Sequence, residues 1–316
     1  MSASMQEIEL KFQVPPESRS RLVEAMGSAA SETTRLRARY FDTADRLLAR
    51  SAFALRLRQE GEGWVQTLKG RGDGLMTRLE HNAPLGADTG DEAPALSLER
   101  HAGTPAGEAL LTLLTRAGYT PADLVQQFST DITRTHAQVQ AEGAVVELAL
   151  DIGVIEGGGQ SLPVWEIEFE LVEGAPQGLL ALAYLWTEAF GLWLDARSKA
   201  ERGDRLARRV TQGEVPTVRP IDAALPWPRR VAVALSPVLA LVGDVAEDLA
   251  SPAQRVALAQ ALATLAEVLR GEESAAGAAE TVAALAGLVF DAAIWRRVET
   301  QALWFNLLDW SLPEPG

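Results

Sequence analysis

Strands that carry charges of a single sign on one face are the feature that most constrains the fold of this chain. The segment "WEIEFEL" (165–171) alternates three glutamates with four apolar residues, and this period of two is that of a β-strand. In "ALRLRQ" (54–59) two arginines share one face in the same way. Like charges about 6–7 Å apart along a strand repel one another unless opposite charges lie between them. We therefore expect the charged faces of different strands to meet each other inside the fold.

Eight segments with this period, most of them joined by short turns, predict an antiparallel β-barrel, because closure leaves no strand edge exposed. The apolar faces then lie outside under helices, and the charged faces line a bore wide enough for side chains or one small ligand. Helices are expected at 15–28, 105–118 and 177–193, and a charged loop leads into a short helix within 195–210. The predicted strands are 5–14, 35–42, 51–60, 63–70, 75–84, 131–141, 143–152 and 163–172.

A change in composition divides the chain into two expected domains. Residues 1–210 form the barrel domain, and 211–228, with its prolines, predicts a linker. Residues 229–316 are rich in Ala, Leu and Val at helical spacing, which predicts a bundle of about four helices. The expected fold class is α+β, an eight-stranded antiparallel barrel with external helices followed by an all-α bundle. The late aromatic residues are interpreted as core or docking residues: Trp295, Trp304, Phe305 and Trp310.

Composition excludes several classes of protein. The net charge of −14 argues against non-specific nucleic-acid binding, because an acidic surface repels the phosphate backbone. The chain has no cysteine, so disulfides and thiolate chemistry are absent. No run approaches the ~20 apolar residues that span a bilayer, and the N-terminus lacks the pattern of a signal peptide. These features predict a cytoplasmic protein without a membrane partner, and they leave the oligomeric state open.

The charged residues of the expected bore point to two kinds of ligand. Carboxylates without histidine or cysteine partners suit hard cations such as Mg²⁺ or Mn²⁺, whereas arginines and lysines suit phosphate oxygens. Lysine is rare here, since Lys11, Lys69 and Lys199 are the only lysines among 29 basic residues. These three are candidate sites where a compact point charge is required. A metal-bound chain of phosphates would satisfy both kinds of group.

The segment "EIELK" (7–11) resembles the ExExK signature of the CYTH superfamily, the triphosphate tunnel metalloenzymes. The resemblance runs in order over about residues 5–210. It implies an eight-stranded antiparallel tunnel that hydrolyses inorganic triphosphate, thiamine triphosphate or RNA 5′-triphosphates, or cyclises ATP. The segments that carry it further are "YFDTADRLLARSAFALRLRQEGEGWVQTLKG" (40–70), "TRLEHN" (77–82), "FSTDITR" (128–134), "VVELALD" (145–151), "WEIEFEL" (165–171) and "SKAERG" (198–203).

The two-part chain also resembles bacterial inorganic triphosphatases that carry a C-terminal CHAD or CHAD-like domain. CHAD domains usually contain a basic motif of the HxxxRxxxRR type. Residues 215–316 contain neither histidine nor lysine and are net acidic. We therefore expect a truncated or degenerate CHAD-like bundle without polyphosphate binding, which could act as a structural brace.

The resemblance implies a role for each polar residue of the tunnel. Metal ligands are expected at Glu7, Glu9, Glu168 and Glu170, with Glu166 on the same face. Phosphate-holding positions are Lys11, Arg56, Arg58, Lys69 and Arg134, with Arg78 and Glu80 extending the lining and Lys199 closing one end. Lys11, Glu147 and Asp151 are the expected catalytic residues, the last two holding or orienting a second metal or its water. His136 is a weak candidate for a general base, His81 and His101 are interpreted as turn or surface residues, and Asp42 as the cap of a turn.

The function that follows is Mg²⁺- or Mn²⁺-dependent hydrolysis of inorganic triphosphate. Three alternatives remain open at this stage. Two are enzymes of the same superfamily, an adenylate cyclase and a thiamine triphosphatase. The third is a polyphosphate or nucleotide sensor without turnover, which the row of three glutamates at 166–170 disfavours, since a pure anion binder gains nothing from added carboxylates.

Overall fold

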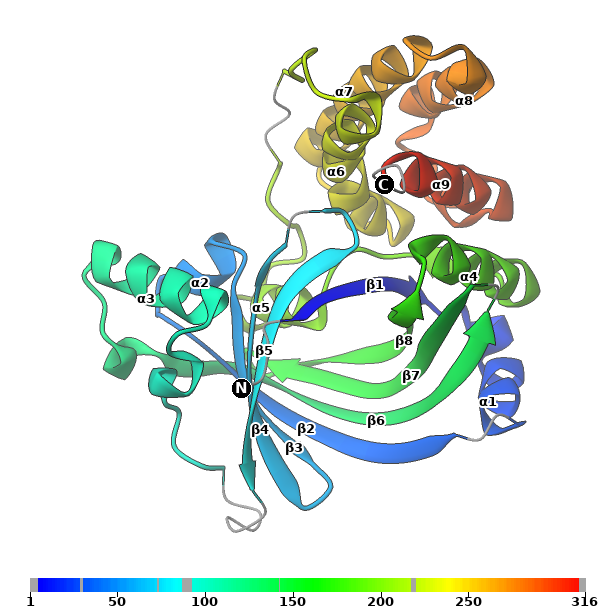
Figure 1. Cartoon of the computed structure of the whole chain (residues 1–316). Coiled ribbons are helices and arrows are strands. Elements are labelled where there is room, and N and C mark those ends of the chain that lie inside the picture. Colours follow the sequence, from blue (N-terminus) through cyan, green and yellow to red (C-terminus); the bar gives the residue numbers. More distant parts are fainter. Residues whose placement is uncertain are drawn as a thin grey trace.

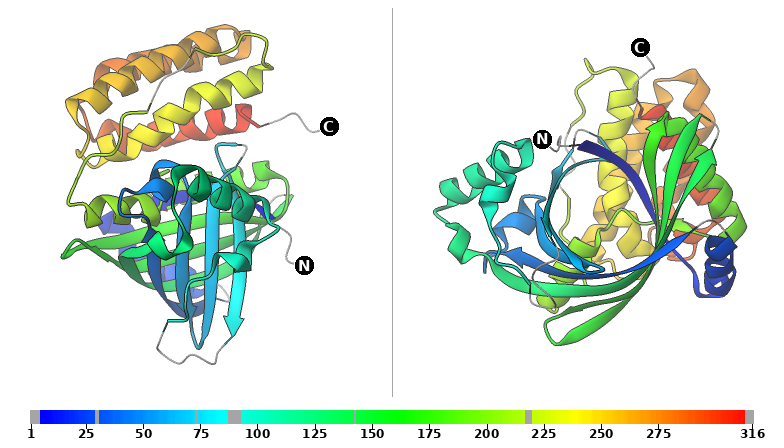
Figure 2. Two further views of the ribbon diagram at one scale, coloured as in Figure 1. Left: turned by 90° about the vertical axis from the view of Figure 1, so that its left-hand side faces the viewer. Right: turned by 60° about the horizontal axis from the view of Figure 1, so that its bottom comes forward.

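A computed structural model describes residues 5–28, 31–72, 74–86, 93–141, 143–216 and 220–312. The first two thirds of the chain form a closed antiparallel barrel (Figures 1 and 2), as predicted. Its strands follow the spatial order β5-β4-β3-β2-β6-β7-β8-β1, and β1 pairs with β5 to close the ring. The strands are β1 (Met5–Gln13), β2 (Glu32–Asp42), β3 (Ala54–Glu60), β4 (Gly63–Arg71), β5 (Thr77–Gly86), β6 (Val125–Ala141), β7 (Ala144–Gly157), β8 (Gln160–Gly174) and the short β9 (Trp193–Leu194), which pairs with β1.

Each predicted strand corresponds to an observed one, with different bounds. The largest differences are in β6, β7 and β8, which have 17, 14 and 15 residues and continue past the expected ends. Residues 51–53, expected to begin a strand, instead form the turn after α2 (Leu47–Arg50), where Ala52 has a φ of 59°. The alternation of polar and apolar residues predicted the central part of each of these strands. It does not show where a strand ends when the residues beyond that part are polar.

Helices surround the barrel as expected and continue into a C-terminal helical part. In Figure 2 this part forms a layer along one side of the barrel. No helix in the described ranges is both long enough and apolar enough to cross a membrane. The α-helices besides α2 are α1 (Arg19–Ser28), α3 (Pro105–Ala117), α4 (Pro176–Phe190), α5 (Lys199–Ala207), α6 (Trp227–Ala246), α7 (Pro252–Arg270), α8 (Ala276–Leu285) and α9 (Val298–Trp310).

Most strands of the barrel turn apolar side chains outward and charged side chains inward, but in β2 the pattern is reversed: Leu36 and Tyr40 line the bore, whereas Arg37 and Arg39 are exposed. Residues of β1, β7 and β8 such as Phe12, Leu148 and Phe169 belong to one large cluster that includes buried residues of α4, α6, α7 and α9. A second cluster lies under α3, where Leu55 of β3 and Leu68 of β4 are fully buried. The helices therefore cover the apolar faces of the strands, which leaves the charged faces to line the bore.

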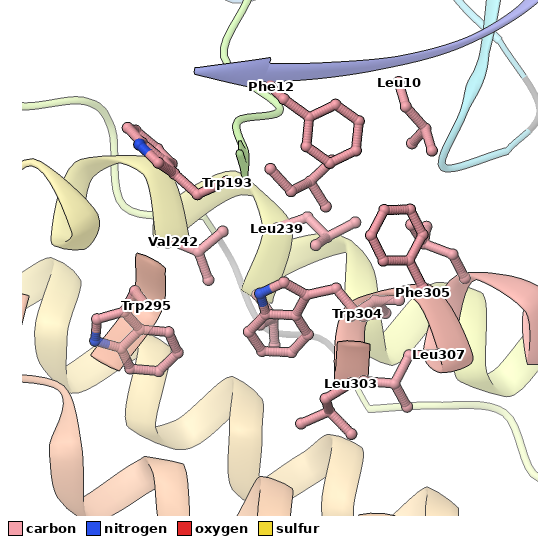
Figure 3. Close-up of a cluster of buried hydrophobic side chains, with 14 of the residues drawn as sticks. Leu10, Phe12, Trp193, Leu239, Val242, Trp295, Leu303, Trp304, Phe305 and Leu307 are labelled. Atoms are coloured by element: carbon pink, nitrogen blue, oxygen red, sulfur yellow. The ribbon is translucent and has the colours of Figure 1, made fainter. Parts of the chain in front are cut away.

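The C-terminal helices pack directly against the barrel wall. Phe12 of β1 stacks on Phe305 of α9 with ring centroids 5.8 Å apart, and Figure 3 shows this pair beside Trp304 and Leu239. The backbone N–H of Leu194 donates to Oε1 of Gln301 at 2.8 Å. Barrel and helices thus share one continuous hydrophobic core. As expected, the late aromatic residues lie in the core or against it, and they are Trp295, Trp304, Phe305 and Trp310.

Helix α5 lies across the strands and covers one end of the bore. Its start is capped by Ser198, whose side chain accepts from the backbone N–H of Glu201 at 3.1 Å. Gly203 allows the helix to approach the sheet, because a Cβ there would lie 2.2 Å from the ring of Phe128. Any larger residue at this position would force α5 away from the barrel.

Asp42 caps the turn after β2, as expected. Its carboxylate accepts from the backbone N–H groups of Thr43, Leu48 and Ala49 at 2.7, 2.8 and 2.9 Å. These bonds occupy both oxygens, so the residue serves the turn after β2.

The interpretation of His81 and His101 as turn or surface residues is wrong. Both are buried, with 8% and 0% exposure, and their Nδ1 atoms lie 2.8 Å apart. Nε2 of His101 lies 2.9 Å from the amide nitrogen of Gln66. Because that amide nitrogen donates, Nε2 of His101 accepts and its Nδ1 carries the proton given to His81. His81 lies on the outer face of β5, and the segment before α3 covers it. The polar residues on either side of His81 in the sequence did not indicate that it is buried.

This pair predicts acid sensitivity. Burial, with His81 and Arg100 nearby, lowers the pKa of His101 to about 4. Between pH 6.5 and 4 the unfolded chain therefore binds a proton that the folded chain does not, so stability falls as the pH decreases through this window. The loss at pH 5 is at most about 2 kcal/mol. Thermal unfolding from pH 7.5 to 5 should show a smaller pH-dependent drop in Tm for His101→Gln than for wild type. Equal slopes would contradict this, and His136→Gln is the control.

Candidate active site

A cavity of about 980 Å³ runs through the barrel and extends to α5 and the segment after it. All three lysines of the chain line it, one from β1, one from β4 and one from the first position of α5. Among the described residues, those predicted from sequence that line this one cavity are Glu7, Glu9, Lys11, Arg56, Arg58, Lys69, Arg78, Glu80, Arg134, Glu147, Asp151, Glu168, Glu170 and Lys199.

Strand register builds an acidic wall from β1, β8 and β7. Glu9 pairs with Glu170 across β1 and β8, and Glu170 pairs with Glu147 across β8 and β7. One step along the barrel, Lys11 pairs with Glu168. Because inward residues recur every second position, the "EIELK" and "WEIEFEL" segments bring their charges to the same height in the bore.

Part of this wall is fully compensated by cations. Arg134 donates to both oxygens of Asp151 at 2.6 and 2.7 Å and also contacts Glu168. Lys199 lies 2.6 Å from Asp151 and 3.0 Å from Glu168. Burial opposes the ionisation of Asp151 and Glu168, but these cations outweigh it and lower the pKa of both carboxyls.

Glu166, expected beside the metal ligands, does not line the cavity. It is fully buried, and its two oxygens contact Lys199 and Arg202 of α5. Carboxylate oxygens of Asp151, Glu166 and Glu168 lie within 4.8 Å of one another, a spacing that could hold an ion. Since three cations already occupy these oxygens, a metal there would displace existing ion pairs. The sequence did not identify Arg202 as a buried partner, because the pattern of "SKAERGDRLARR" is typical of a charged helix that faces solvent.

The other part of the acidic wall is short of positive charge. Lys69 is shared between Glu7 at 3.0 Å and Glu80 at 2.6 Å. Burial raises the pKa of Glu7 to about 8, and burial with Glu147 also raises the pKa of Glu170. The carboxylates of Glu9 and Glu80 also raise the pKa of Glu7. In the described structure Lys69 is the one cation that pairs with Glu7 and Glu80, so this region favours a further cation.

Glu9 links the two parts of the wall. Lys11 lies 2.6 Å and Arg78 2.9 Å from its Oε1. Burial raises the pKa of this carboxyl, but Lys11 and Lys69 outweigh it and lower the pKa to about 2. Glu9 is therefore ionised at neutral pH, whereas the pKa of the neighbouring Glu7 is shifted in the opposite direction.

The opposite wall is basic through Arg56 and Arg58 of β3, beside Tyr40 of β2. Arg56 donates to the hydroxyl of Tyr40 at 3.3 Å, and its buried Nε has no hydrogen-bond partner in the described structure. Arg58 pairs with Glu60 through Nε at 2.6 Å. Tyr40 stacks on Phe128 with centroids 4.5 Å apart. Burial opposes its ionisation, but Arg56 and the other cations of the bore lower its pKa. Tyr40 was missed because it shares its strand face with Leu36 and Ala38.

The two walls define what the cavity can bind. A buried guanidinium nitrogen without a partner favours an anion that brings oxygens to it. Across the bore, a set of donors composed only of carboxylate oxygens, in which Glu7 and Glu80 share one ammonium group, fits a hard divalent ion. His136, the weak candidate for a base, has its Nδ1 3.5 Å from Glu147. A ligand with several phosphate groups and a bound divalent cation satisfies both walls at once.

Comparison with known proteins agrees with the fold. The profile of the CYTH domain matches residues 5–203. The inorganic triphosphatase of Haemophilus influenzae is 31% identical over 205 residues, which are 63% of this chain and 54% of that protein. This chain thus spans about half the length of that curated relative.

Solved structures also align with this chain. One is a Hippeastrum protein with a dominant triphosphatase activity, with a TM-score of 0.42 and 20% identity over 64% of this chain and 95% of that one. Another is a Pyrococcus horikoshii protein, with a TM-score of 0.41 and 21% identity over 62% and 97%. The domain profile covers more than half of the sequence, and the chain belongs to the CYTH domain family.

Proposed function

We propose that this chain hydrolyses inorganic triphosphate to pyrophosphate and phosphate inside the barrel, with Mg²⁺ or Mn²⁺ as cofactor. The observation that carries the proposal is the pair of incompletely neutralised walls. Arg56 offers a buried donor without a partner in the described structure, and on the facing wall Glu7 and Glu80 share the single ammonium group of Lys69. The 31% identity to an inorganic triphosphatase supports the choice of substrate.

The carboxylates divide into two groups in this proposal. Glu7, Glu9 and Glu170 would hold the divalent ion together with Glu168, whose pairs with Arg134 and Lys199 the ion would partly replace. When it is bound, the ion neutralises charge on the phosphates and polarises the phosphorus. Asp151 and Glu166 are committed to Arg134, Lys199 and Arg202. We therefore assign these two residues to fixing the cations in place, which refines the roles expected from the resemblance.

The phosphate groups would be held by the cations of the bore. Lys11 and Lys69 lie next to the acidic wall, whereas Arg56 and Arg58 line the opposite one. Hydrolysis requires a water oxygen to attack the terminal phosphorus in line while the bond to the bridging oxygen breaks and pyrophosphate leaves. Glu147, half-buried in the cavity wall, is better placed to orient this water than Asp151, whose two oxygens Arg134 occupies.

The test of the substrate is phosphate release from tripolyphosphate, pyrophosphate, ATP and thiamine triphosphate, with Mg²⁺ and Mn²⁺ compared and cyclic AMP assayed in parallel. The proposal predicts the highest kcat/KM for tripolyphosphate. A preference for thiamine triphosphate, or formation of cyclic AMP from ATP, would replace it by one of the other enzymes of the superfamily. Binding of tripolyphosphate without release of phosphate would indicate a sensor.

The metal requirement gives a separate prediction. Excess EDTA should abolish phosphate release, because four carboxylates facing a polyanion without a cation repel it. Addition of Mg²⁺ or Mn²⁺ above the EDTA concentration should restore the rate. Full activity in EDTA would contradict the assignment of a metal to the acidic wall.

A further inference from the structure

We propose that the C-terminal helices position Lys199 in the bore through a buried ionic hub centred on Asp244 of α6. The hub is defined by Asp195, Arg197, Arg205, Asp244 and Gln254. Its consequence for catalysis rests on the proposed function, whereas its effect on α5 does not. Asp244 and Arg197 would then be positioning residues that act on the site from outside the barrel.

Asp244 joins three elements at one point. Its side chain is fully buried. Oδ1 accepts from Nη1 of Arg197 at 2.9 Å and from Nη1 of Arg205 at 2.5 Å, and Oδ2 accepts from the amide of Gln254 at 2.7 Å. Arg197 precedes α5 and Arg205 lies within it, while Gln254 belongs to α7. One carboxylate of the helical part therefore holds α5 at both ends, through Arg197 before its first residue and Arg205 in its last turn.

Arg197 completes the hub with charge-assisted bonds in several directions. It is 2% exposed, and its Nε and Nη2 donate to Asp195 at 2.8 and 2.7 Å. Nη2 also donates to Glu247 at 2.7 Å. A buried guanidinium costs several kcal/mol of desolvation unless its donors are matched in this way. The geometry is consequently fixed, since a displaced Arg197 would leave charges buried without partners.

Two glycines make room for these arginines. A Cβ on Gly243 of α6 would lie 2.5 Å from Nε of Arg197 and 2.6 Å from Oδ1 of Asp195. A Cβ on Gly213 would lie 2.1 Å from Nη2 of Arg205. The close approach of α6 to α5 thus requires glycine at these two positions. This requirement is separate from the ion pairs of the hub.

The hub is connected to the bore in two ways, by two residues of chain to Lys199 and by hydrogen bonds to β1. Lys199 is two residues after Arg197, and its ammonium group contacts Asp151, Glu166 and Glu168. On the other side, the N–H of Asp195 donates to the carbonyl of Lys11 at 2.9 Å, and Gln13 donates to Oδ2 of Asp195 at 2.9 Å. Two of the three lysines in the tunnel are therefore adjacent to residues that the hub holds.

The helical part supplies a rigid support for this hub. Leu239 and Val242 of α6 lie among the buried side chains between β1 and α9 (Figure 3). A helix of nine residues such as α5 is marginal without tertiary contacts. Its position over the bore accordingly depends on anchors, and Asp244 provides one on α6.

The first experiment compares Asp244→Asn with wild type by hydrogen exchange, which needs no activity. The expected result is faster exchange of the α5 amides with unchanged protection of β7 and β8. Asp248→Asn is the matched control, because Asp248 pairs with Arg255 within the helical part at 2.6 Å and is exposed. Unchanged protection of α5 in Asp244→Asn would overturn the proposal.

The second experiment is a double-mutant cycle on tripolyphosphate hydrolysis with Lys199→Met. If Asp244 acts through Lys199, Asp244→Asn lowers kcat/KM roughly 10- to 100-fold in the wild-type background and has little further effect on Lys199→Met. An equal loss in both backgrounds, or no loss in either, contradicts a positioning role. Asp248→Asn should leave kcat/KM unchanged in both.

A milder variant covers failure of Asp244→Asn to fold. Glu247→Gln removes one partner of Arg197 at a partly exposed position, and it should show the same pattern with smaller effects. Additive losses for this variant would likewise overturn the proposal. If the wild-type protein has no triphosphatase activity, only the proposed function is refuted. The hydrogen-exchange experiment still decides whether the hub holds α5.

Discussion

Glu168→Gln is expected to lower kcat for tripolyphosphate about a thousandfold, because loss of a carboxylate that binds the metal removes several kcal/mol of charge stabilisation. The fold should persist. Arg134 keeps both bonds to Asp151, and Lys199 keeps its contacts with Asp151 and Glu166. We expect the free energy of unfolding to fall by about 1–2 kcal/mol. Steady-state phosphate release and thermal unfolding measure the two effects.

The matched control is Glu156→Gln, on the neighbouring strand β7, where the side chain is exposed. It should change neither kcat nor Tm appreciably. A Glu168→Gln enzyme that retains more than about a tenth of wild-type kcat with unchanged metal dependence would remove Glu168 from the metal site, since a lost ligand costs well over one factor of ten.

Arg56→Met should weaken binding of the triphosphate about 10- to 100-fold, as expected for one lost hydrogen bond to a charged group. Methionine keeps an unbranched apolar side chain of similar length in the bore and leaves Tyr40 in its stack on Phe128. The measurement is calorimetric titration of tripolyphosphate with Mg²⁺ into a slow background such as Glu168→Gln, or KM where turnover is used.

Arg39→Met is the control for this prediction. Arg39 belongs to β2 and is exposed, so its loss tests whether the overall charge of the strand matters. Equal losses of affinity in the two variants would indicate a general electrostatic effect, and an unchanged affinity in Arg56→Met would show that the phosphates bind elsewhere.

The sequence predicted the wall of the barrel well because inside and outside differ in chemistry. Alternation in "EIELK" and "WEIEFEL" assigned each glutamate to the bore, and strand pairing then placed Glu9 beside Glu170. The three lysines, identified by their rarity and by the resemblance, all line the cavity. These predictions depend on local periodicity, which a single sequence contains.

What the sequence did not predict depends on contacts between distant segments. Glu166 shares its strand face with Glu168, yet α5 brings Arg202 against it and removes it from the cavity. Tyr40 looked apolar by pattern, but Arg56 sixteen residues later reaches its hydroxyl. His81 and His101 became a buried pair only once the chain before α3 covered β5. Asp244 likewise acquires its partners 39 and 47 residues away.

The most direct test of the central claim is a crystal structure of the protein with tripolyphosphate and Mn²⁺, with the anomalous signal used to locate the metal. The account predicts phosphate density inside the barrel, with oxygens at Arg56 and Lys11, and an anomalous peak among Glu7, Glu9, Glu168 and Glu170. An empty bore with the ligand on the outer surface, or a metal bound only at Asp151 and Glu166, would contradict it.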